Sequence, residues 1–333
     1  MNGSPQGGPG PELSVIIPTR DRRAVLVETL CRLIAHAPSA PIEVIVVDDG
    51  SGDGGAAAAE SLPVPWRLAV LRQDARGPAA ARNRGIAAAT APACLFIGDD
   101  SLPTEELIDR HVDFHRAHPE RTEALLGLVV PAPPLDASTL QWWLHEEGAQ
   151  FSYAALVAGE TAPPSCFWTS NVSVKRALLR QVGGFDESFP GAACEDAELG
   201  FRLSRVGMTL RYDPRALAEH FHPTDLPRVL RRMQTIGVAY RRLHELAPEA
   251  VQPTRPGPRH RVKAAALTLA MLPGRRPARE AAWRFLCDEA LREAYWGDGV
   301  GNAPAPRIGR SLARLAVSDP AAVPPAPPVP ARP

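Results

Sequence analysis

Two adjacent carboxylates, Asp99 and Asp100, come directly after a short apolar run, residues 93–97 (ACLFI). Such a run is typical of a buried strand in a parallel sheet. Side chains that follow the strand lie at the carboxyl edge of the sheet, where ligands bind. Because neighbouring acids repel each other, this pair suggests a hard divalent cation as a ligand. A turn or a helix cap is the alternative explanation.

Two histidines and a second acidic pair lie further along the chain. His220 and His222 follow an expected short strand at residues 209–212, and alternate positions on an extended chain point the same way. One of them can complete a metal shell or contact a diphosphate, and a packed or surface pair is the alternative.

Glu195 and Asp196 open an expected helix, where the helix dipole alone already favours acids.

Strand-like and helix-like segments alternate in the first third of the chain. Apolar and β-branched runs predict four strands, at residues 13–17, 43–47, 68–71 and 93–97. Helical patterns between them imply parallel βαβ units and therefore an α/β fold. A nicotinamide-type dinucleotide fold would need a glycine-rich turn after the first strand. Residues 18–23 stand there and contain no glycine.

Composition limits the class of protein. The chain has 333 residues, enough for one large α/β domain with an appendage. Its 37 basic and 37 acidic residues give a formal charge of zero, which argues against a nucleic-acid-binding protein. The cysteines follow no metal or disulfide spacing, which fits a reducing compartment. Without a signal-like start or an apolar stretch long enough for a bilayer, we expect a cytoplasmic protein.

Six segments, in the right order and spacing, resemble the family-2 inverting glycosyltransferases of GT-A fold. They are SVIIPTRD at 14–21, VVDDGS at 46–51, GPAAARNRG at 77–85, GDDSLP at 98–103, GGFDE at 183–187 and EDAELGFRL at 195–203. The resemblance covers about residues 12–225 and implies a mostly parallel sheet flanked by helices. It divides this region into a nucleotide-binding half, 12–103, and an acceptor-binding catalytic half, 104–225.

By this resemblance the substrate is a sugar nucleotide held by the N-terminal half. The implied nucleotide contacts are Pro18, Thr19, Asp21, Asp49, Ser51, Gly77, Arg82 and Asp99. Asp49 is implied to accept a hydrogen bond from a uracil-type N–H, with turn chemistry as its alternative. Arg82 can present its fork of donors to phosphate or lie on a solvated helix face. Asp99 is implied to contact the ribose or the donor sugar.

Asp100 matches the second acid of the family's metal-binding Asp-x-Asp pattern, and Gly98 stands at the position of the first. The resemblance implies Mg²⁺ or Mn²⁺, held by Asp100, His220 and several diphosphate oxygens. The glycine removes one protein ligand from the pattern, which weakens the expectation of tight metal binding.

The resemblance makes Asp196 the general base, with Glu195 beside it. The Asp196 carboxylate would take the proton of an acceptor hydroxyl while that oxygen attacks the anomeric carbon opposite the leaving nucleotide, which inverts configuration. Asn171 is implied to lie near the donor sugar, with an interior turn asparagine as the alternative. Trp143 falls in the segment 131–165, where acceptors bind; an exposed indole stacks on a sugar, whereas a buried one, the preferred interpretation, fills core.

The remainder of the chain is expected to form an extension and two tails. Residues 226–301 are expected to be helical and basic, starting near Asp225. Such a segment can dock peripherally on the anionic inner face of a membrane or on a lipid phosphate, or it can be a solvated surface. The Pro-rich ends, residues 1–11 and 302–333, are expected to be disordered.

The expected function is a metal-dependent inverting glycosyltransferase of polysaccharide or glycoconjugate biosynthesis. It would move one sugar from a UDP-, GDP- or dTDP-sugar to a hydroxyl of a sugar, a lipid-linked compound or a small molecule. Processive members add a Gln-x-x-Arg-Trp motif and transmembrane helices, both absent here, which favours single-sugar transfer. The alternatives are a nucleotidyltransferase acting on sugar phosphates, which usually has a glycine-rich basic loop, and a catalytically silent nucleotide-sugar-binding module.

Overall fold

The computed structural model describes residues 10–133, 135, 138–146, 150–189, 191–250 and 276–296. The tail expected at 302–333 lies outside these residues, as do 1–9 of the N-terminal tail and 251–275 and 297–301 of the extension. In chain order the elements are β1 Leu13–Thr19, α1 Arg23–Ala35, β2 Ile42–Asp48, α2 Gly55–Glu60, β3 Arg67–Arg72, α3 Pro78–Ala88, β4 Ala93–Ile97, β5 Ser101–Pro103, α4 Leu107–Ala117, β6 Glu123–Pro131, α5 Thr139–Glu146, the 3₁₀ turns η2 Tyr153–Ala155 and η3 Pro164–Cys166, β7 Asn171–Lys175, α6 Arg176–Val182, α7 Glu195–Arg205, β8 Thr209–His220, α8 Leu226–Leu246 and α10 Arg276–Trp296.

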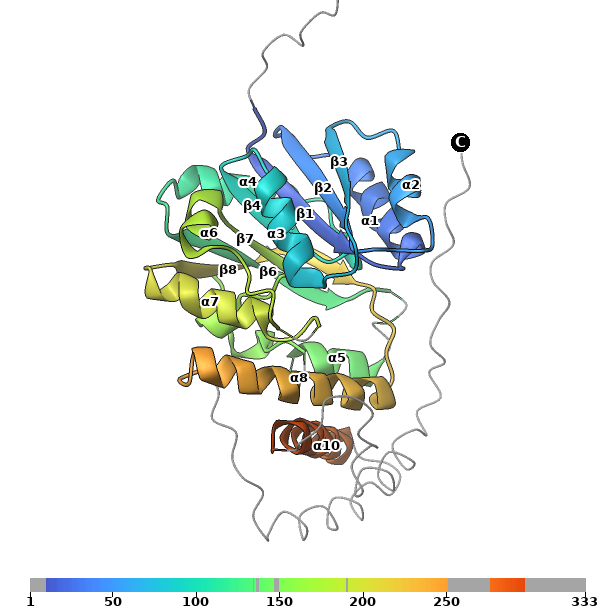
Figure 1. Ribbon diagram of the computed structural model, residues 1–333, viewed down its shortest axis with the longest axis vertical. Helices are drawn as coiled ribbons and strands as arrows, with labels where there is room; N and C mark the ends of the chain where they lie inside the picture. Colours follow the sequence, from blue (N-terminus) through green and yellow to red (C-terminus); the bar gives the residue numbers. More distant parts are fainter. Residues whose placement is uncertain are drawn as a thin grey trace, which may run out of the picture.

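One eight-stranded sheet, in the order β3-β2-β1-β4-β7-β6-β8-β5, forms the centre of the molecule. β1 to β4 run parallel to one another, whereas β7 runs antiparallel to both β4 and β6. Figure 1 shows α3 in front of this sheet and α1 and α2 behind it. The chain therefore reverses its direction across the sheet between β1 and β4. A reversal of this kind opens the crevice in which α/β proteins bind ligands.

The first four strands were predicted from sequence to within two residues at each end, and β4 has the predicted bounds. Every residue of β2 and β4 is buried, which explains their unbroken apolar runs. β8 differs from its prediction, because it continues past Tyr212 to His220. Its pairing with β6 shifts between Gly127 and Leu128, so that residues 214–216 bulge out and the strand resumes beyond them.

A helical layer lies beyond the edge of the sheet. α8 begins where the sequence predicted, and the Asp225 side chain accepts from the backbone N–H of Arg228 at 2.8 Å, as an N-cap. Figure 1 shows α10 next to α8 and farther from the sheet. Apolar side chains of α5, α8 and α10 form one cluster, including Trp143, Met233 and Trp283. The described part of the extension is thus helical, as predicted.

Part of the basic surface expected on α8 serves packing. Arg241 donates to the backbone carbonyls of Ala294 and Tyr295, at the C-terminal end of α10, where a cation is favoured by the helix dipole. Arg242 pairs with Asp186 at 3.2 Å. No helix in the described parts of the chain is long and apolar enough to cross a membrane.

Gly200, in the middle of α7, yields a test of this packing. A Cβ added there would lie 2.1 Å from the Pro164 carbonyl oxygen and 2.8 Å from the Phe167 Cβ. Helix propensity alone would favour Gly200→Ala by about 1 kcal/mol. Overpacking against backbone costs about 1–3 kcal/mol and should outweigh it. We expect Gly200→Ala to lower the melting temperature by several degrees, whereas Ser204→Ala, on the exposed side of the same helix, should not. An increase for Gly200→Ala would contradict the close contact.

Candidate active site

Asp99 and Asp100 lie in the tight turn between β4 and β5, and both are almost fully buried, with 4% and 6% of their surface exposed. The backbone carbonyl of Asp99 accepts from the Thr29 hydroxyl at 2.7 Å. Its carboxylate accepts from the Thr19 hydroxyl, at the end of β1, at 2.8 Å. Because β1 and β4 are parallel neighbours, their carboxyl ends bring Thr19 and Asp99 together.

Arg22 supplies positive charge to this acid pair. Its guanidinium lies 3.1 Å from Asp99 Oδ1 and 2.7 Å from Asp100 Oδ2. Burial and the neighbouring Asp100 raise the pKa of Asp99, while Arg22 opposes that rise. Burial also acts to raise the pKa of Asp100, but His220 and Arg22 hold it well below its usual range. The two acids therefore differ, and Asp100 is the better anionic ligand of the pair.

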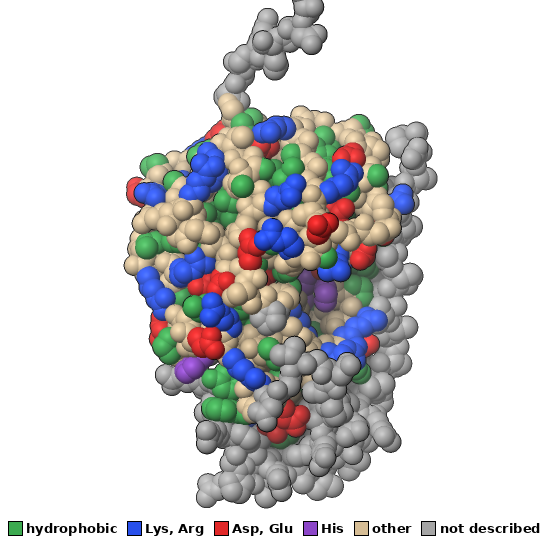
Figure 2. All heavy atoms as spheres, in the orientation of Figure 1, with side chains coloured by type: hydrophobic (Ala, Val, Ile, Leu, Met, Phe, Trp, Pro, Cys, Tyr) green, Lys and Arg blue, Asp and Glu red, His purple; other side chains and the backbone are tan. Residues whose placement is uncertain are grey.

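Two histidines converge on the same oxygen of Asp100. His222 Nδ1 lies 3.0 Å and His220 Nε2 lies 3.3 Å from Asp100 Oδ2. Their rings stack at 5.3 Å, which confirms that alternate positions on this extended segment face the same way. On the far side of His220, its Nδ1 lies 3.2 Å from His145 Nε2. Figure 2 shows a histidine side chain inside a hollow of the surface.

Asp100, His220 and His222 offer three ligand atoms within 4.8 Å of one another. One carboxylate oxygen and two imidazole nitrogens suit Mn²⁺ better than Mg²⁺, which prefers oxygen ligands. Gly98 is part of this arrangement, since a Cβ there would lie 2.6 Å from Asp100 Oδ1. The residue that breaks the Asp-x-Asp pattern therefore gives the Asp100 carboxylate room to sit where it does, and the donor set fits a divalent cation.

Asp49 shapes the loop that precedes α3. Its carboxylate accepts from the backbone N–H groups of Arg76 and Gly77, at 2.8 and 2.9 Å, and from Gln73 Nε2 at 2.8 Å. Gly77 adopts φ 92° there, which favours glycine. The turn at residues 48–51 is instead held by Asp48, whose carboxylate accepts from the Ser51 N–H at 2.8 Å, so turn chemistry is not the role of the Asp49 side chain. The contacts of Asp49 occupy both of its carboxylate oxygens, so any bond to a base would be made in addition to them or in their place.

The other residues predicted to bind nucleotide gather at the carboxyl ends of β1 and β2. The Asp21 carboxylate accepts from the Gly52 N–H at 2.8 Å, and the Asp21 N–H donates to the Ser51 hydroxyl at 2.9 Å. The Thr19 carbonyl accepts from the Asp49 N–H at 2.9 Å, and Pro18 precedes it in β1. These bonds join two loops into one rim beside Asp99.

Arg82, in α3, forms a buried ion pair with Glu195. Its NH1 lies 2.8 Å from Glu195 Oε1, and both side chains are at least nine-tenths buried. Arg82 Nε and Glu195 Oε2 are buried without a hydrogen-bond partner. Arg82 is buried, so it does not lie on a solvated helix face, and its implied contact with a phosphate stays a prediction. The pair instead joins α3 to the start of α7.

Asp196 is more exposed than Glu195 and lies in the first turn of α7. Its Oδ1 accepts from the Ala197 N–H at 2.8 Å, and no ion pair involves it among the described residues. Burial and the adjacent Asp196 raise the pKa of Glu195, while Arg82 opposes the rise. Of the two acids, Asp196 is therefore the one with a carboxylate available to another molecule.

The two residues considered as sugar contacts, Asn171 and Trp143, are both buried. Asn171 is fully buried; its amide donates to the carbonyls of Leu128 and Ala216 and accepts from His111. These bonds hold β7 against the bulge of β8, which argues against contact with a donor sugar. Trp143 is 2% exposed and packs on Trp283 with ring centroids 5.7 Å apart. It fills core, as the preferred interpretation had it, and is not a platform for an acceptor.

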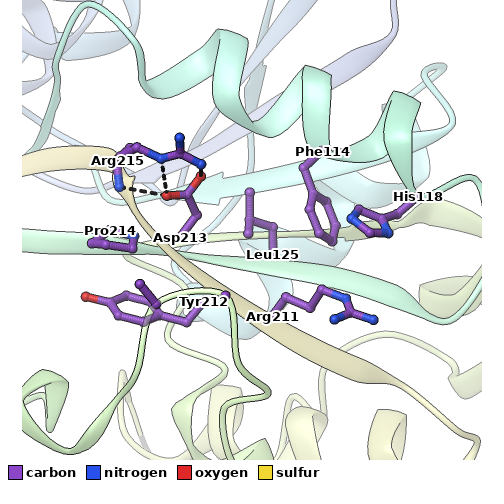
Figure 3. Close-up of a pocket in the computed structure, with 10 residues that line it drawn as sticks. Phe114, His118, Leu125, Arg211, Tyr212, Asp213, Pro214 and Arg215 are labelled. Atoms are coloured by element: carbon purple, nitrogen blue, oxygen red, sulfur yellow. Dashed lines mark hydrogen bonds and ion pairs between the residues drawn. The ribbon is translucent and has the colours of Figure 1, made fainter.

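Sequence reasoning missed two residues of the site. Arg22 lies in the turn directly after β1, at the ligand-binding edge of the sheet, which is a signal that could have drawn attention to it. His145 comes from α5, and nothing in its sequence surroundings indicates contact with His220. A cavity of about 500 Å³ elsewhere, between α4 and the β8 bulge, shares none of these residues and is lined by Phe114, Tyr212 and Arg215 among others (Figure 3).

The buried pair of Arg82 and Glu195 can be tested by its effect on stability. Removing one partner of such a pair costs about 3–5 kcal/mol. Arg82→Met removes the opposing charge, so the pKa of Glu195 in the folded state should rise further above its unfolded value. Because Glu195 then ionises less readily in the folded protein than in the unfolded one, the free energy of unfolding falls as pH rises through the range between the two pKa values. We expect the urea midpoint of Arg82→Met, relative to the unmodified protein, to fall more at about pH 8 than at about pH 5.

The matched control is the double variant Arg82→Met/Glu195→Gln, which has no buried acid to titrate. Its midpoint, relative to the unmodified protein, should lack the added loss at high pH. Equal losses for Arg82→Met at both pH values would contradict the role assigned to the pair.

Comparison with known proteins identifies the family. Residues 14–127 match the family model described as Glycosyl transferase family 2, and residues 95–247 match the one described as Glycosyl transferase family group 2. The chain is 33% identical over 225 residues to validoxylamine A glucosyltransferase of Streptomyces hygroscopicus subsp. limoneus, covering 60% of this chain and 49% of that protein. It is 31% identical over 238 residues to pre-mycofactocin glycosyltransferase of Mycobacterium tuberculosis, covering 67% of this chain and 45% of that protein.

The chain thus spans about half the length of these relatives. Among solved structures, the mannosyltransferase PcManGT from Pyrobaculum calidifontis, in complex with GDP-Man and Mn²⁺, superposes with a TM-score of 0.59 at 20% identity, covering 87% of this chain and 88% of that one. S. aureus TarS 1–349 in complex with UDP superposes with a TM-score of 0.52 at 17% identity, covering 85% and 90%. These two likenesses concern the fold. The family matches place this chain in glycosyltransferase family 2, and the two structural likenesses show that it has the GT-A fold.

Proposed function

We propose that this protein is a metal-dependent inverting glycosyltransferase that moves one sugar from a nucleotide-sugar donor to an acceptor hydroxyl. The observation that carries the proposal is the buried acid pair with two histidines on Asp100, at the reversal of strand order in a family-2 chain. The PcManGT complex, with its GDP-Man and Mn²⁺, supports a nucleotide sugar and a divalent cation as the ligands here.

The donor would bind along the rim formed by the ends of β1, β2 and β4. Thr19, Asp21 and Ser51 line the loops of that rim, and Asp99 is the carboxylate next to them, suited to a ribose or donor-sugar hydroxyl. Asp100, His220 and His222 would hold Mn²⁺ or Mg²⁺. A bound cation would offset the negative charge of the diphosphate as it leaves.

Asp196 would act as the general base. Its carboxylate takes the proton from the acceptor hydroxyl, and the hydroxyl oxygen forms a bond to the anomeric carbon while the bond from that carbon to the diphosphate oxygen breaks on the opposite face. The configuration at the anomeric carbon is thereby inverted. Arg82 and Glu195 fix the first turn of α7, and so position Asp196 without taking up its charge.

The acceptor would be a sugar, a lipid-linked compound or a small molecule, reached from the side of α8. Arg228 and Arg231 are exposed on the first half of α8, and no acidic residue of the described chain pairs with Arg231. We propose a cytoplasmic enzyme in which these arginines can contact a lipid phosphate or an anionic membrane surface peripherally.

Slow hydrolysis of the donor tests the function without a known acceptor. Incubating the protein with UDP-, GDP- and dTDP-sugars and Mn²⁺ should release one nucleoside diphosphate well above the rate without protein. Chelation of the metal and Asp100→Ala should each reduce both this release and the affinity for the released nucleotide, measured by calorimetry. Release that is equal with metal and with chelator would contradict the metal site, and no release from any donor would contradict the function.

Asp196→Asn tests the base. Loss of a positioned base commonly costs 10²–10⁴-fold in rate, whereas loss of an acid in a first helical turn costs about 1 kcal/mol of stability or less. The asparagine keeps the size of the side chain, so nucleotide affinity and melting temperature should stay close to those of the unmodified protein. Sugar transfer should nearly vanish. Normal transfer by this variant, alongside a loss for Glu195→Gln, would assign the base to Glu195 instead.

A further inference from the structure

Arg22 occupies the space between the two acids of the proposed metal site. Its two terminal nitrogens reach separate carboxylates, at 3.1 Å from Asp99 Oδ1 and 2.7 Å from Asp100 Oδ2. A planar guanidinium presents its donors as a fork, so it can bridge two acids in a way that a lysine cannot. The acid pair is therefore already neutralised in part by the protein itself.

The contact with Asp100 involves the oxygen that a metal would need. Asp100 Oδ2 has Arg22 NH2, His222 Nδ1 and His220 Nε2 as neighbours, at 2.7, 3.0 and 3.3 Å. A carboxylate oxygen has two lone pairs, so it cannot accept full hydrogen bonds from all three of these neighbours at once. A divalent cation shared by Asp100 and the two histidines would also lie next to the Arg22 charge and be repelled by it. Metal and guanidinium compete for the same oxygen.

Within the described residues, the polar contacts of the Arg22 side chain are those with Asp99 and Asp100. Its side chain is 35% exposed, whereas those of Asp99 and Asp100 are 6% and 9% exposed. It lies at the start of α1 and makes no helix-capping bond with its side chain. A nucleoside diphosphate at the same rim would offer the guanidinium phosphate oxygens in exchange, in the bidentate geometry that arginine favours.

We propose that Arg22 is the resident counter-ion of Asp99 and Asp100, that it excludes free divalent metal from them, and that it moves to the diphosphate when metal and nucleotide bind together. The inference rests on the proposed function and extends it to the order of binding. Metal alone binds weakly because Arg22 must be displaced without a new partner. Metal with nucleotide binds tightly because the displaced guanidinium gains a phosphate. Arg22 thus couples the two ligands.

The test compares Arg22→Met with Arg20→Met in the full chain. Arg20 lies two residues away, is exposed, and has only Asp21 at 3.9 Å as an ion-pair partner in the described structure, so it is a matched control. Binding of Mn²⁺ to the protein without nucleotide is measured by the electron paramagnetic resonance signal of free Mn²⁺. Affinity for UDP and GDP is then measured by calorimetry, with Mn²⁺ and with chelator.

Arg22→Met should bind Mn²⁺ alone about tenfold more tightly and should bind the nucleotide in the presence of Mn²⁺ about tenfold more weakly. Arg20→Met should change neither affinity. Arg22→Lys, which keeps the charge and is the second variant should Arg22→Met fold poorly, should exclude Mn²⁺ less well than arginine does. Melting curves of each variant check folding.

Three results would overturn the inference. If the affinity for Mn²⁺ is the same in both Arg22 variants as in the unmodified protein, or if none of these proteins binds Mn²⁺, then Arg22 does not compete with the metal. Nucleotide affinity that is unchanged in Arg22→Met removes the transfer to the diphosphate. Nucleotide binding that ignores Mn²⁺ in the unmodified protein but needs it in Arg22→Met means that the guanidinium permanently replaces the metal. Failure of the proposed function would give a different result, because the unmodified protein would then bind neither UDP nor GDP. The effect of Arg22 on Mn²⁺ binding could still be measured, since that measurement uses no nucleotide.

Discussion

Two carboxylates buried side by side are costly to keep charged, and much of the site can be understood from that constraint. Asp99 and Asp100 lie in a turn whose backbone is held on both residues, because the Thr29 hydroxyl donates to the Asp99 carbonyl and the Phe221 N–H donates to the Asp100 carbonyl at 2.8 Å. Burying ionised carboxylates without compensation is strongly unfavourable. The surrounding elements therefore have to deliver positive charge and hydrogen-bond donors to two neighbouring side chains.

That compensation comes from parts of the chain far apart in sequence, and the sheet topology brings them together. β1 delivers Thr19 and, just beyond its end, Arg22, because β1 lies next to β4. β8 delivers His220, because Ser101 in β5 pairs directly with His220 in the register of those two strands. The bulge in β8 sets which residues reach this end of the strand, so a local irregularity about four residues before His220 determines the histidine register.

Sequence patterns predicted the parts of this arrangement that depend on local chemistry. The bounds of β4, the Asp225 cap of α8 and the shared direction of His220 and His222 follow from apolar runs, capping and strand alternation. Contacts between residues far apart in the sequence could not be predicted from these local patterns. Arg22 with Asp100, and Arg82 with Glu195, require knowledge of which strands and helices are neighbours. Asn171 illustrates the same limit, since a polar residue near a strand end gives no sign that its amide will be consumed by three partners in the core.

The two acidic pairs, Asp99 with Asp100 and Glu195 with Asp196, are arranged alike. In each, the first acid is tied to another element: Asp99 by the Thr19 hydroxyl, and Glu195 by Arg82. The second acid has contacts of another kind: Asp100 with Arg22 and the two histidines, and Asp196 with the N–H of Ala197. The first acid fixes the backbone of the other, since adjacent residues share a peptide plane. In each pair, the contacts of the first acid therefore help to position the second acid. This gives a reason for two adjacent acids, rather than one, at both places.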